Sequence, residues 1–280
     1  MRAEVETPYR VEQICGVMGM SRQAHYQWLS RYAEGALQEQ ILLQRVKEIR
    51  RRHPRMGGRK LHYLVSQEFV EMGFSIGRDG FFALLSENGL LISRRRRVIL
   101  TTHSRHWLRV YDNLILDQKT TKPNQIWASD ITYLRTRAGF CYLALVLDMY
   151  SRMIIGWELR QSLAVEVALF ALMAALEQVK TTQGMIHHSD HGAQYCAEVY
   201  VRLLEERAIR ISMATKGNPY ENAMAERTIG ILKDEYHLDA CFNDYELAYQ
   251  AVKEAIYLYN YERPHTSINF LTPVQKHAIS

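Results

Sequence analysis

The sequence predicts two structural classes in one chain: an all-helical front half, followed by an α/β part with a mixed sheet flanked by helices. As far as about residue 97, apolar residues recur at helical spacing, interrupted by glycine and proline. Beyond Pro123, three strand-like segments follow one another and then alternate with helical ones. The net charge also changes sign, from +9 over residues 1–122 to −4 over residues 123–280. This asymmetry suggests a part that holds a polyanion joined to a part that carries carboxylates, although a solvated basic surface would also produce it.

Composition excludes several classes of protein. The 280 residues suggest about two domains, and the 48% hydrophobic and 23% charged residues are typical of a globular protein rather than a disordered one. The longest apolar stretches, Cys141–Leu147 and Leu163–Leu176, are too short to span a membrane. Four scattered cysteines without a CxxC pair fit a reduced, cytoplasmic protein. We therefore expect neither a membrane protein nor a secreted one.

The first 35 residues read as a helix-turn-helix-like segment. Thr7 and Pro8 open a short helix that Gly19 ends, and Ser21 caps a second helix through Tyr32. The second helix is expected to bury Ala24 and Trp28. Its opposite face carries side chains suited to base edges and phosphates, namely Arg22, Gln23 and Tyr26.

Residues 36–97 read as a second helical, helix-turn-helix-like DNA-binding domain. One helix ends at Arg52 before Pro54, another opens at Gly57-Gly58, and a third runs to Gly89, a suitable C′ residue. The basic side chains expected to contact phosphates here are Arg59, Lys60, Arg78, Arg94, Arg95, Arg96 and Arg97. Residues 98–122 form a polar linker.

Residues 123–240 form the α/β part, and residues 241–280 its helical extension. Strands are expected over residues 126–135, 140–148, 153–159, 185–189 and 209–213. Helices are expected over residues 163–179, 194–207 and 220–236. Asp148 closes the second strand and is expected to cap the turn that follows it.

Three carboxylates occupy positions that suggest a catalytic or metal-binding role. Asp130 lies inside a segment whose other residues suit a central strand, and Asp190 follows a strand end. Glu226 lies on a helix with Asn222 and Lys233 on the same face. Carboxylates that meet at one sheet edge need a counter-cation, and their hard oxygens favour Mg²⁺ or Mn²⁺. Two such ions can drive cleavage and joining of phosphodiesters. Each acid could instead be capped or salt-bridged.

Between Asp190 and Glu226 there are 35 residues, and the strings around the acids are distinctive. They are Trp127–Tyr133, His188–Gly192, Asn218–Ala223, Tyr259–His265 and Thr272-Pro273. With these strings the chain resembles the DDE transposases and retroviral-type integrases, and most closely the second-frame (OrfB-type) transposases of bacterial insertion-sequence family three. The resemblance covers residues 123–280 as the catalytic core and residues 40–97 as the preceding helix-turn-helix region.

The resemblance implies an RNase H-like integrase core in which Asp130, Asp190 and Glu226 are catalytic and hold two Mg²⁺ (or Mn²⁺) ions. It implies that the chain binds the double-stranded terminal inverted repeats of an insertion sequence and target DNA, with Lys233 and Asn222 near the DNA. It further implies a homo-oligomer, at least a dimer, in the bacterial cytoplasm, with a first-frame protein as a further partner. One departure is that residues 1–122 lack the His/Cys zinc set of retroviral integrases.

Two other functions remain open from the residues alone. One is an RNase H-like, structure-specific nuclease without strand transfer, and the other is a helix-turn-helix regulator with an inactive core. The intact acidic triad argues against the regulator. A zinc site at His187, His188 and His191 is disfavoured because a closed ligand set is lacking. Tyr195 is interpreted as a packing residue, and Glu221 as a helix cap.

Overall fold

The computed structural model describes residues 10–93, 108–116, 118–215 and 221–279. These residues divide into two compact units. The front unit consists of the chain up to Arg51 together with Leu64–Leu91, and the core unit consists of Arg52–Tyr63 and Ile92–Ser280. Across the described ranges, no helix has both the length and the apolar composition needed to cross a lipid bilayer.

The front unit is helical, as its periodicity predicts. Its helices are α1 (Val11–Val17), α2 (Arg22–Arg52), α3 (Gly58–Glu71) and α4 (Arg78–Glu87), of which α2 and α3 continue into the core unit. Within this unit, the buried side chains of α2, α3 and α4 recur at spacings of three or four residues and are Leu42, Val46, Val65, Phe69, Phe81, Leu84 and Leu85. Gly89, at φ +64°, follows α4 in the left-handed conformation expected for a C′ glycine.

The helix expected to end at Tyr32 does not end there. α2 continues to Arg52, so the expected domain boundary after residue 35 falls inside one helix. Leu, Ala, Gln and Glu, all good helix formers, fill most of residues 33–44. The expectation that Trp28 is buried is also wrong: its side chain is 54% exposed and stacks on Tyr32 at a centroid distance of 5.4 Å.

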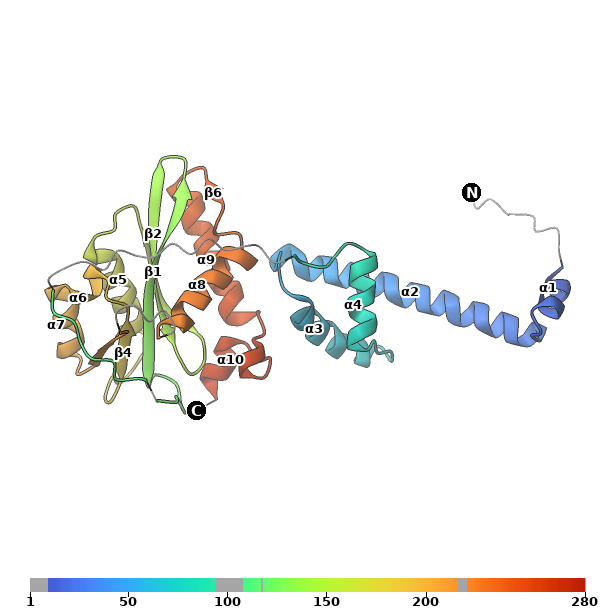
Figure 1. Cartoon of the computed structure of the whole chain (residues 1–280), viewed down its shortest axis with the longest axis horizontal. Helices are drawn as coiled ribbons and strands as arrows, with labels where there is room; N and C mark the ends of the chain where they lie inside the picture. The colour runs from blue at the N-terminus through green and yellow to red at the C-terminus, as the bar shows by residue number, and fades with distance from the viewer. Residues whose placement is uncertain (1–9, 94–107, 117, 216–220, 280) are drawn as a thin grey trace. The chain divides into compact units, whose positions relative to one another are not determined.

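The core unit contains one mixed sheet (Figure 1). Its strands are β1 (Ile126–Thr136), β2 (Gly139–Asp148), β3 (Ile154–Arg160), β4 (Ile186–Ser189), β5 (Arg210–Met213) and β6 (Cys241–Phe242). The order is β3-β2-β1-β4-β5, with β6 also paired to β1. The β1–β2 and β2–β3 pairs are antiparallel, whereas β1–β4, β4–β5 and β1–β6 are parallel. β1 therefore stands at the centre of the sheet, where both its edges are hydrogen-bonded.

Helices cover both faces of this sheet (Figure 1). One apolar cluster joins Trp127 and other side chains of one face to α5 (Val165–Leu176), α6 (Ala193–Cys196) and α7 (Glu198–Glu206). A second cluster joins Leu134 and the opposite face to α8 (Ala223–Glu235) and α9 (Tyr245–Tyr261). Because side chains alternate along a strand, Asp130 projects on the same side as Leu134, towards α8 and α9.

Two expectations for the core need correction. The helix expected over residues 194–207 is broken at Ala197, whose ψ of 138° is extended, so it forms α6 and α7. Residues 108–116, expected to be linker, pack on the core: Leu114 N donates to Ser212 Oγ, and Ile115 is buried with Ile126 and Ile186.

The C-terminal extension is helical, as expected, and closes the core. After α9 come a short 3₁₀ turn, Thr266–Ile268, and α10 (Pro273–Ala278), which Thr272 caps through Gln275 N. Asn260, near the end of α9, accepts a hydrogen bond from Ile154 N and donates one to Ile154 O. Its amide thus replaces a strand partner at the start of β3.

Candidate active site

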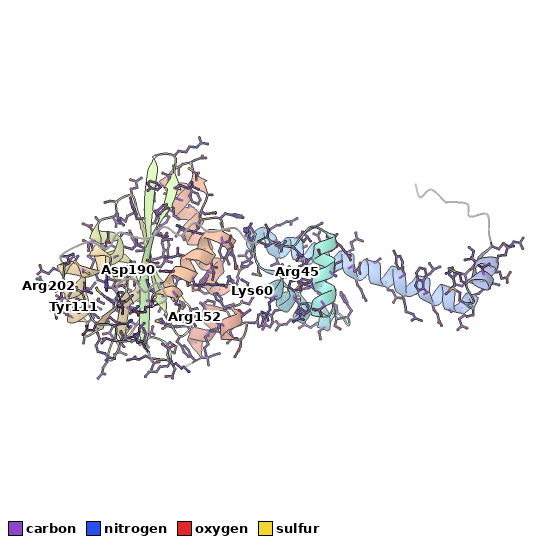
Figure 2. The ribbon with its side chains drawn as sticks, viewed as in Figure 1. Arg45, Lys60, Tyr111, Arg152, Asp190 and Arg202 are labelled. Atoms are coloured by element: carbon purple, nitrogen blue, oxygen red, sulfur yellow. The ribbon has the colours of Figure 1, made fainter. Side chains whose placement is uncertain are left out.

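The sheet register brings Asp130 and Asp190 to neighbouring positions. β1 and β4 pair in parallel through Ala128 and His188, and two residues further along each chain stand Asp130 and Asp190. Asp190 follows the last residue of β4, and Figure 2 labels it beside the sheet. Its Oδ1 accepts a hydrogen bond from Gly192 N at 2.9 Å, while Asp130 Oδ1 accepts one from Ile131 N at 2.8 Å. Both carboxylates are thus fixed to their own backbone.

Helix α8 is tied to β1 at both ends. Asn222, its N-cap residue, donates through its side-chain amide to Ser129 O at 3.2 Å. Lys233, in its last turn, donates through Nζ to Thr132 Oγ1 at 2.6 Å. Glu226 lies four residues after Asn222 and seven before Lys233, hence on the same helical face. The two hydrogen bonds therefore hold Glu226 over the stretch of β1 that contains Asp130.

The three carboxylates interact electrostatically. Burial, the charge of Asp190 and the charge of Glu226 raise the pKa of Asp130 well above its usual value, against the opposing effects of Ile131 N–H and Lys233. Burial and then Asp190 also raise the pKa of Glu226. Like charges that disfavour one another's ionised form identify a site that a cation would stabilise.

The donor set fits a hard divalent cation, since three carboxylates are the ligands that Mg²⁺ and Mn²⁺ prefer. Over the described ranges, however, no three His, Cys, Asp or Glu side chains stand close enough together to hold a metal ion as they are. Asp130, Asp190 and Glu226 lie within electrostatic range rather than at ligand spacing. The three carboxylates would therefore have to come closer together before all of them could coordinate one cation.

Lys233 completes the charge distribution. Its ammonium lies 4.7 Å from the centre of the Tyr133 ring and also donates a hydrogen bond to Thr132 Oγ1. Burial lowers the pKa of Lys233, and the nearby carboxylate of Asp130 counteracts that shift. Lys233 therefore supplies one positive charge beside the acids from a fixed position, with aromatic and hydroxyl partners holding it.

The neighbouring residues have structural partners. Burial lowers the pKa of His187 to about 3, and its Nε2 lies 2.8 Å from Ser129 Oγ and 2.9 Å from the Tyr200 hydroxyl. His188 Nδ1 lies 2.9 Å from Ser212 Oγ. Asp148 caps its turn as expected, because Ser151 N and Oγ both donate to it.

Glu221 was expected to cap α8, but the N-cap residue is Asn222. The Glu221 carboxylate instead accepts hydrogen bonds from Thr215 N and from Asn113 Nδ2.

The side chains expected to contact DNA fall into three groups. Those that are exposed are Arg22, Gln23, Tyr26, Arg59 and Arg78, with Arg22 also paired to Glu12 and Arg78 to Asp79. Those that are largely enclosed are Lys60, Asn222 and Lys233. The run Arg94–Arg97 lies outside the described residues.

Sequence reasoning missed an ion-pair network around Glu235, at the end of α8. Arg263 donates to both carboxylate oxygens of Glu235 at 2.8 and 2.7 Å, and Lys60 Nζ donates to one of them at 2.7 Å. Despite burial, these two cations lower the pKa of Glu235 to about 2, whereas burial lowers the pKa of Lys60 to about 8. Arg263 lies in the string Tyr259–His265, but that string does not indicate Glu235 or Lys60 as its partners. Lys60 is shown in Figure 2.

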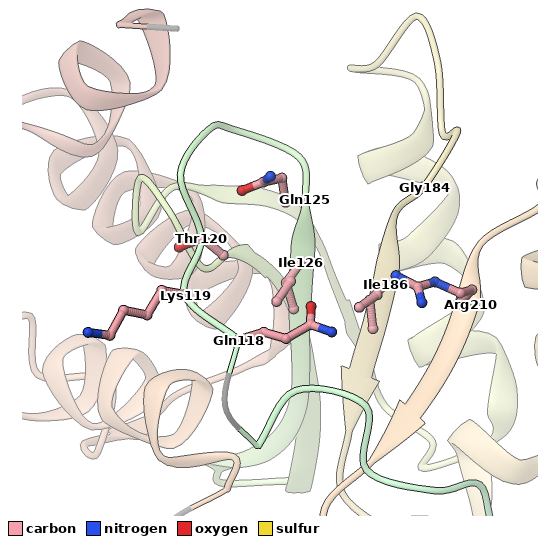
Figure 3. A pocket seen from close by; sticks show the side chains of 8 residues that line it. All are labelled: Gln118, Lys119, Thr120, Gln125, Ile126, Gly184, Ile186 and Arg210. Carbon is pink, nitrogen blue, oxygen red and sulfur yellow. The ribbon is translucent and has the colours of Figure 1, made fainter.

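A polar hollow of about 150 Å³ lies away from these acids (Figure 3). Its lining comes from the segment before β1 and from the beginnings of β1, β4 and β5, and includes Lys119, Gln125, Gly184 and Arg210. Asp130 and Asp190 lie further along β1 and β4, so this hollow is separate from the acidic cluster.

Comparison with known proteins gives the fold and the family. The family model described as "Integrase core domain" matches residues 120–219, and a second model with the same description matches residues 207–273. A cryo-electron microscopy structure of a simian T-cell lymphotropic virus intasome in complex with a PP2A regulatory subunit matches with a TM-score of 0.50 at 19% identity. That match covers 80% of this chain and 75% of the other, and it supports the expected RNase H-like fold.

Two relatives match over almost the whole chain. An uncharacterized 31 kDa protein of insertion element IS600 from Shigella sonnei is 35% identical over 93% of this chain and 96% of its own length. Transposase InsF for insertion sequence IS3A from Escherichia coli (strain K12) is 30% identical over 96% of this chain and 94% of its own length. The chain therefore belongs to the IS3-type DDE transposases, polynucleotidyl transferases built on an integrase core domain.

Proposed function

We propose that this transposase binds the terminal inverted repeats of its own insertion element and uses Asp130, Asp190 and Glu226 to hold two Mg²⁺ (or Mn²⁺) ions while it cuts and joins DNA. The observation that carries the proposal is the coupling of the three carboxylates: each of the two with a raised pKa owes part of the shift to Asp190. The three residues are far apart in the sequence: Asp130 lies in β1, Asp190 directly follows β4, and Glu226 lies in α8.

Bound divalent cations would supply Lewis-acid activation of the attacking hydroxyl and the scissile phosphate. The chain's own residues prepare that site. Asp130, in β1, and Asp190, directly after the adjacent strand β4, present carboxylate oxygens, and α8 presents Glu226 beside β1. Lys233 adds a fixed positive charge next to Asp130, where the DNA backbone would approach. Water and a DNA 3′-hydroxyl serve as nucleophiles in turn, so no covalent bond between protein and DNA is needed.

The exposed basic and polar residues of the front half are proposed to hold the terminal repeats. Arg22, Gln23 and Tyr26 lie exposed at the start of α2, and Arg59 and Arg78 are exposed at the starts of α3 and α4. Arginine contacts to phosphates release counterions, so binding should weaken steeply as salt rises. Because two element ends must be joined together, we propose at least a dimer, assisted by a first-frame partner protein, acting on DNA in the bacterial cytoplasm.

A strand-transfer assay tests the proposal. Labelled DNA ending in the element's terminal repeat is incubated with Mg²⁺ and the wild-type chain, Glu226→Gln, or Glu254→Gln, an exposed carboxylate on α9 that serves as the matched control. We expect cleaved and joined products with the wild type and Glu254→Gln and none with Glu226→Gln. Cleavage without joining would indicate a nuclease, and binding without cleavage a regulator.

A further inference from the structure

Tyr195, on α6, has a buried hydroxyl that the packing of the core does not explain. Its side chain is only 2% exposed, and its ring lies edge-on to Tyr200 and tilted to His187, with centroid distances of 5.5 and 6.2 Å. Among the residues that the structure describes, the hydroxyl has no hydrogen-bond partner. A buried donor without a partner destabilises a fold, so phenylalanine would suit this position better if packing were its whole purpose.

Tyr200 provides a direct comparison within the same cluster. It is 1% exposed, and its hydroxyl lies 2.9 Å from His187 Nε2. The core therefore satisfies one buried tyrosine hydroxyl and leaves the neighbouring one unsatisfied. Tyr195 and Tyr200 therefore differ in the groups that surround their hydroxyls.

The unsatisfied hydroxyl experiences the charges of two of the candidate catalytic carboxylates. The charges of Asp130 and Asp190 both act on Tyr195 and, with burial, raise its pKa well above the usual value, so the hydroxyl keeps its proton. Gly192 marks how tightly this corner is packed: a Cβ there would stand 3.0 Å from Asp190 Oδ1 and 3.3 Å from Tyr195 Cδ2. The ring of Tyr195 and the carboxylate of Asp190 thus border the same glycine.

We propose that Tyr195 is a positioning residue whose hydroxyl donates a hydrogen bond to the Asp190 carboxylate once the acids turn inward to hold divalent cations. An ionised carboxylate accepts several hydrogen bonds, and a donor behind it fixes which oxygen faces the ion. This inference rests on the proposed metal-holding role of Asp130, Asp190 and Glu226.

Tyr195→Phe and Tyr200→Phe, each of which deletes one hydroxyl, test the inference as a matched pair. Three quantities are measured: the melting temperature in EDTA, Mn²⁺ binding to the DNA-free protein by electron paramagnetic resonance, and the Mg²⁺ concentration for half-maximal DNA cleavage. For Tyr195→Phe we expect an unchanged or higher melting temperature, with Mn²⁺ affinity weakened and the Mg²⁺ midpoint raised, each about tenfold. For Tyr200→Phe we expect a melting temperature lower by about 4 °C and unchanged metal dependence.

A Tyr195→Phe chain with the wild-type Mg²⁺ midpoint and Mn²⁺ affinity would overturn the inference. A melting temperature in EDTA lower than that of the wild type would overturn it as well, because it would show that the hydroxyl already has a partner without metal. Failure of the proposed function is recognised separately: Glu226→Gln would then cleave DNA as the wild type does, whatever the result for Tyr195→Phe.

Discussion

The side-chain amide of Asn222 donates a hydrogen bond to the main-chain oxygen of Ser129, the residue before Asp130. Asn222 is buried and is the N-cap residue of α8, so this contact sets where the helix bearing Glu226 begins relative to the central strand. The bond from Lys233 to Thr132 sets where the helix lies at its other end. Glu226 is thereby positioned by two residues that flank Asp130 in β1.

Replacing Asn222 by alanine should slow catalysis without weakening DNA binding. The change removes one tether of α8 and leaves the buried Ser129 oxygen without that donor, at a cost of about 1–2 kcal/mol in stability. We expect the cleavage rate at saturating DNA to fall about tenfold or more, since catalytic groups need sub-ångström placement. The dissociation constant for terminal-repeat DNA should stay at the wild-type value. An increase in that constant with an unchanged rate would instead make Asn222 a direct DNA contact.

Replacing Asp130 by asparagine should stabilise the metal-free chain at neutral pH. Because the pKa of Asp130 is raised in the folded state, the folded chain holds this proton more tightly than the unfolded chain does. The stability that the folded chain gains from this tighter proton binding is fully present below the unfolded pKa of Asp130, about 4. It is lost as pH rises through the folded pKa. In EDTA, the melting temperature of Asp130→Asn should exceed that of the wild type at pH 7, and the difference should vanish near pH 4. Equal melting temperatures at pH 7 would show that folding does not raise the pKa of this carboxylate.

Replacing Glu235 by glutamine should destabilise the core by about 3 kcal/mol, because the change leaves the charge of Arg263, which is only 5% exposed, without its partner. The matched control is Glu198→Gln, which breaks the exposed pair with Arg202 and should cost less than about 0.5 kcal/mol. Urea unfolding at pH 7 measures both. Since the pKa of Glu235 is lowered to about 2, its contribution should persist above about pH 4 and disappear as pH falls towards 2. Similar losses for the two variants would contradict this account of the network.

Replacing Gly156 by alanine should force β3 and α5 apart. A Cβ at this position would lie 2.7 Å from Ala175 N and 2.8 Å from Ala175 Cβ, and would also collide with Ala171 O. Helix backbone cannot yield as a side chain can, so we expect a loss of about 3 kcal/mol in urea unfolding. The control is Gly35→Ala within α2, where nothing lies within 4 Å; it should gain about 1 kcal/mol. A neutral Gly156→Ala would mean that the close approach is not a constraint.

Much of the site could be predicted because local patterns determine it. A single acid among residues that suit a central strand identified β1 and Asp130, and helical spacing put Asn222, Glu226 and Lys233 on one face. What the pattern could not reveal are partners far apart in sequence. Asn260 and Ile154 are 106 residues apart, and Glu235 and Lys60 are 175 apart. Their side-chain types alone do not say that they meet.

Two further differences have local causes. The sequence prediction ended the second helix at Tyr32, although no proline follows until Pro54, and α2 runs on to Arg52. The unsatisfied hydroxyl of Tyr195 was missed because burial predicts packing but says nothing of hydrogen bonds.

The central claim is that Asp130, Asp190 and Glu226 together hold divalent cations. It is tested most directly by anomalous X-ray diffraction from crystals of the chain bound to terminal-repeat DNA and soaked in Mn²⁺. The account predicts anomalous peaks with carboxylate oxygens of all three residues at about 2.1–2.2 Å. Mn²⁺ peaks elsewhere in the same crystals, with none among these three side chains, would contradict it.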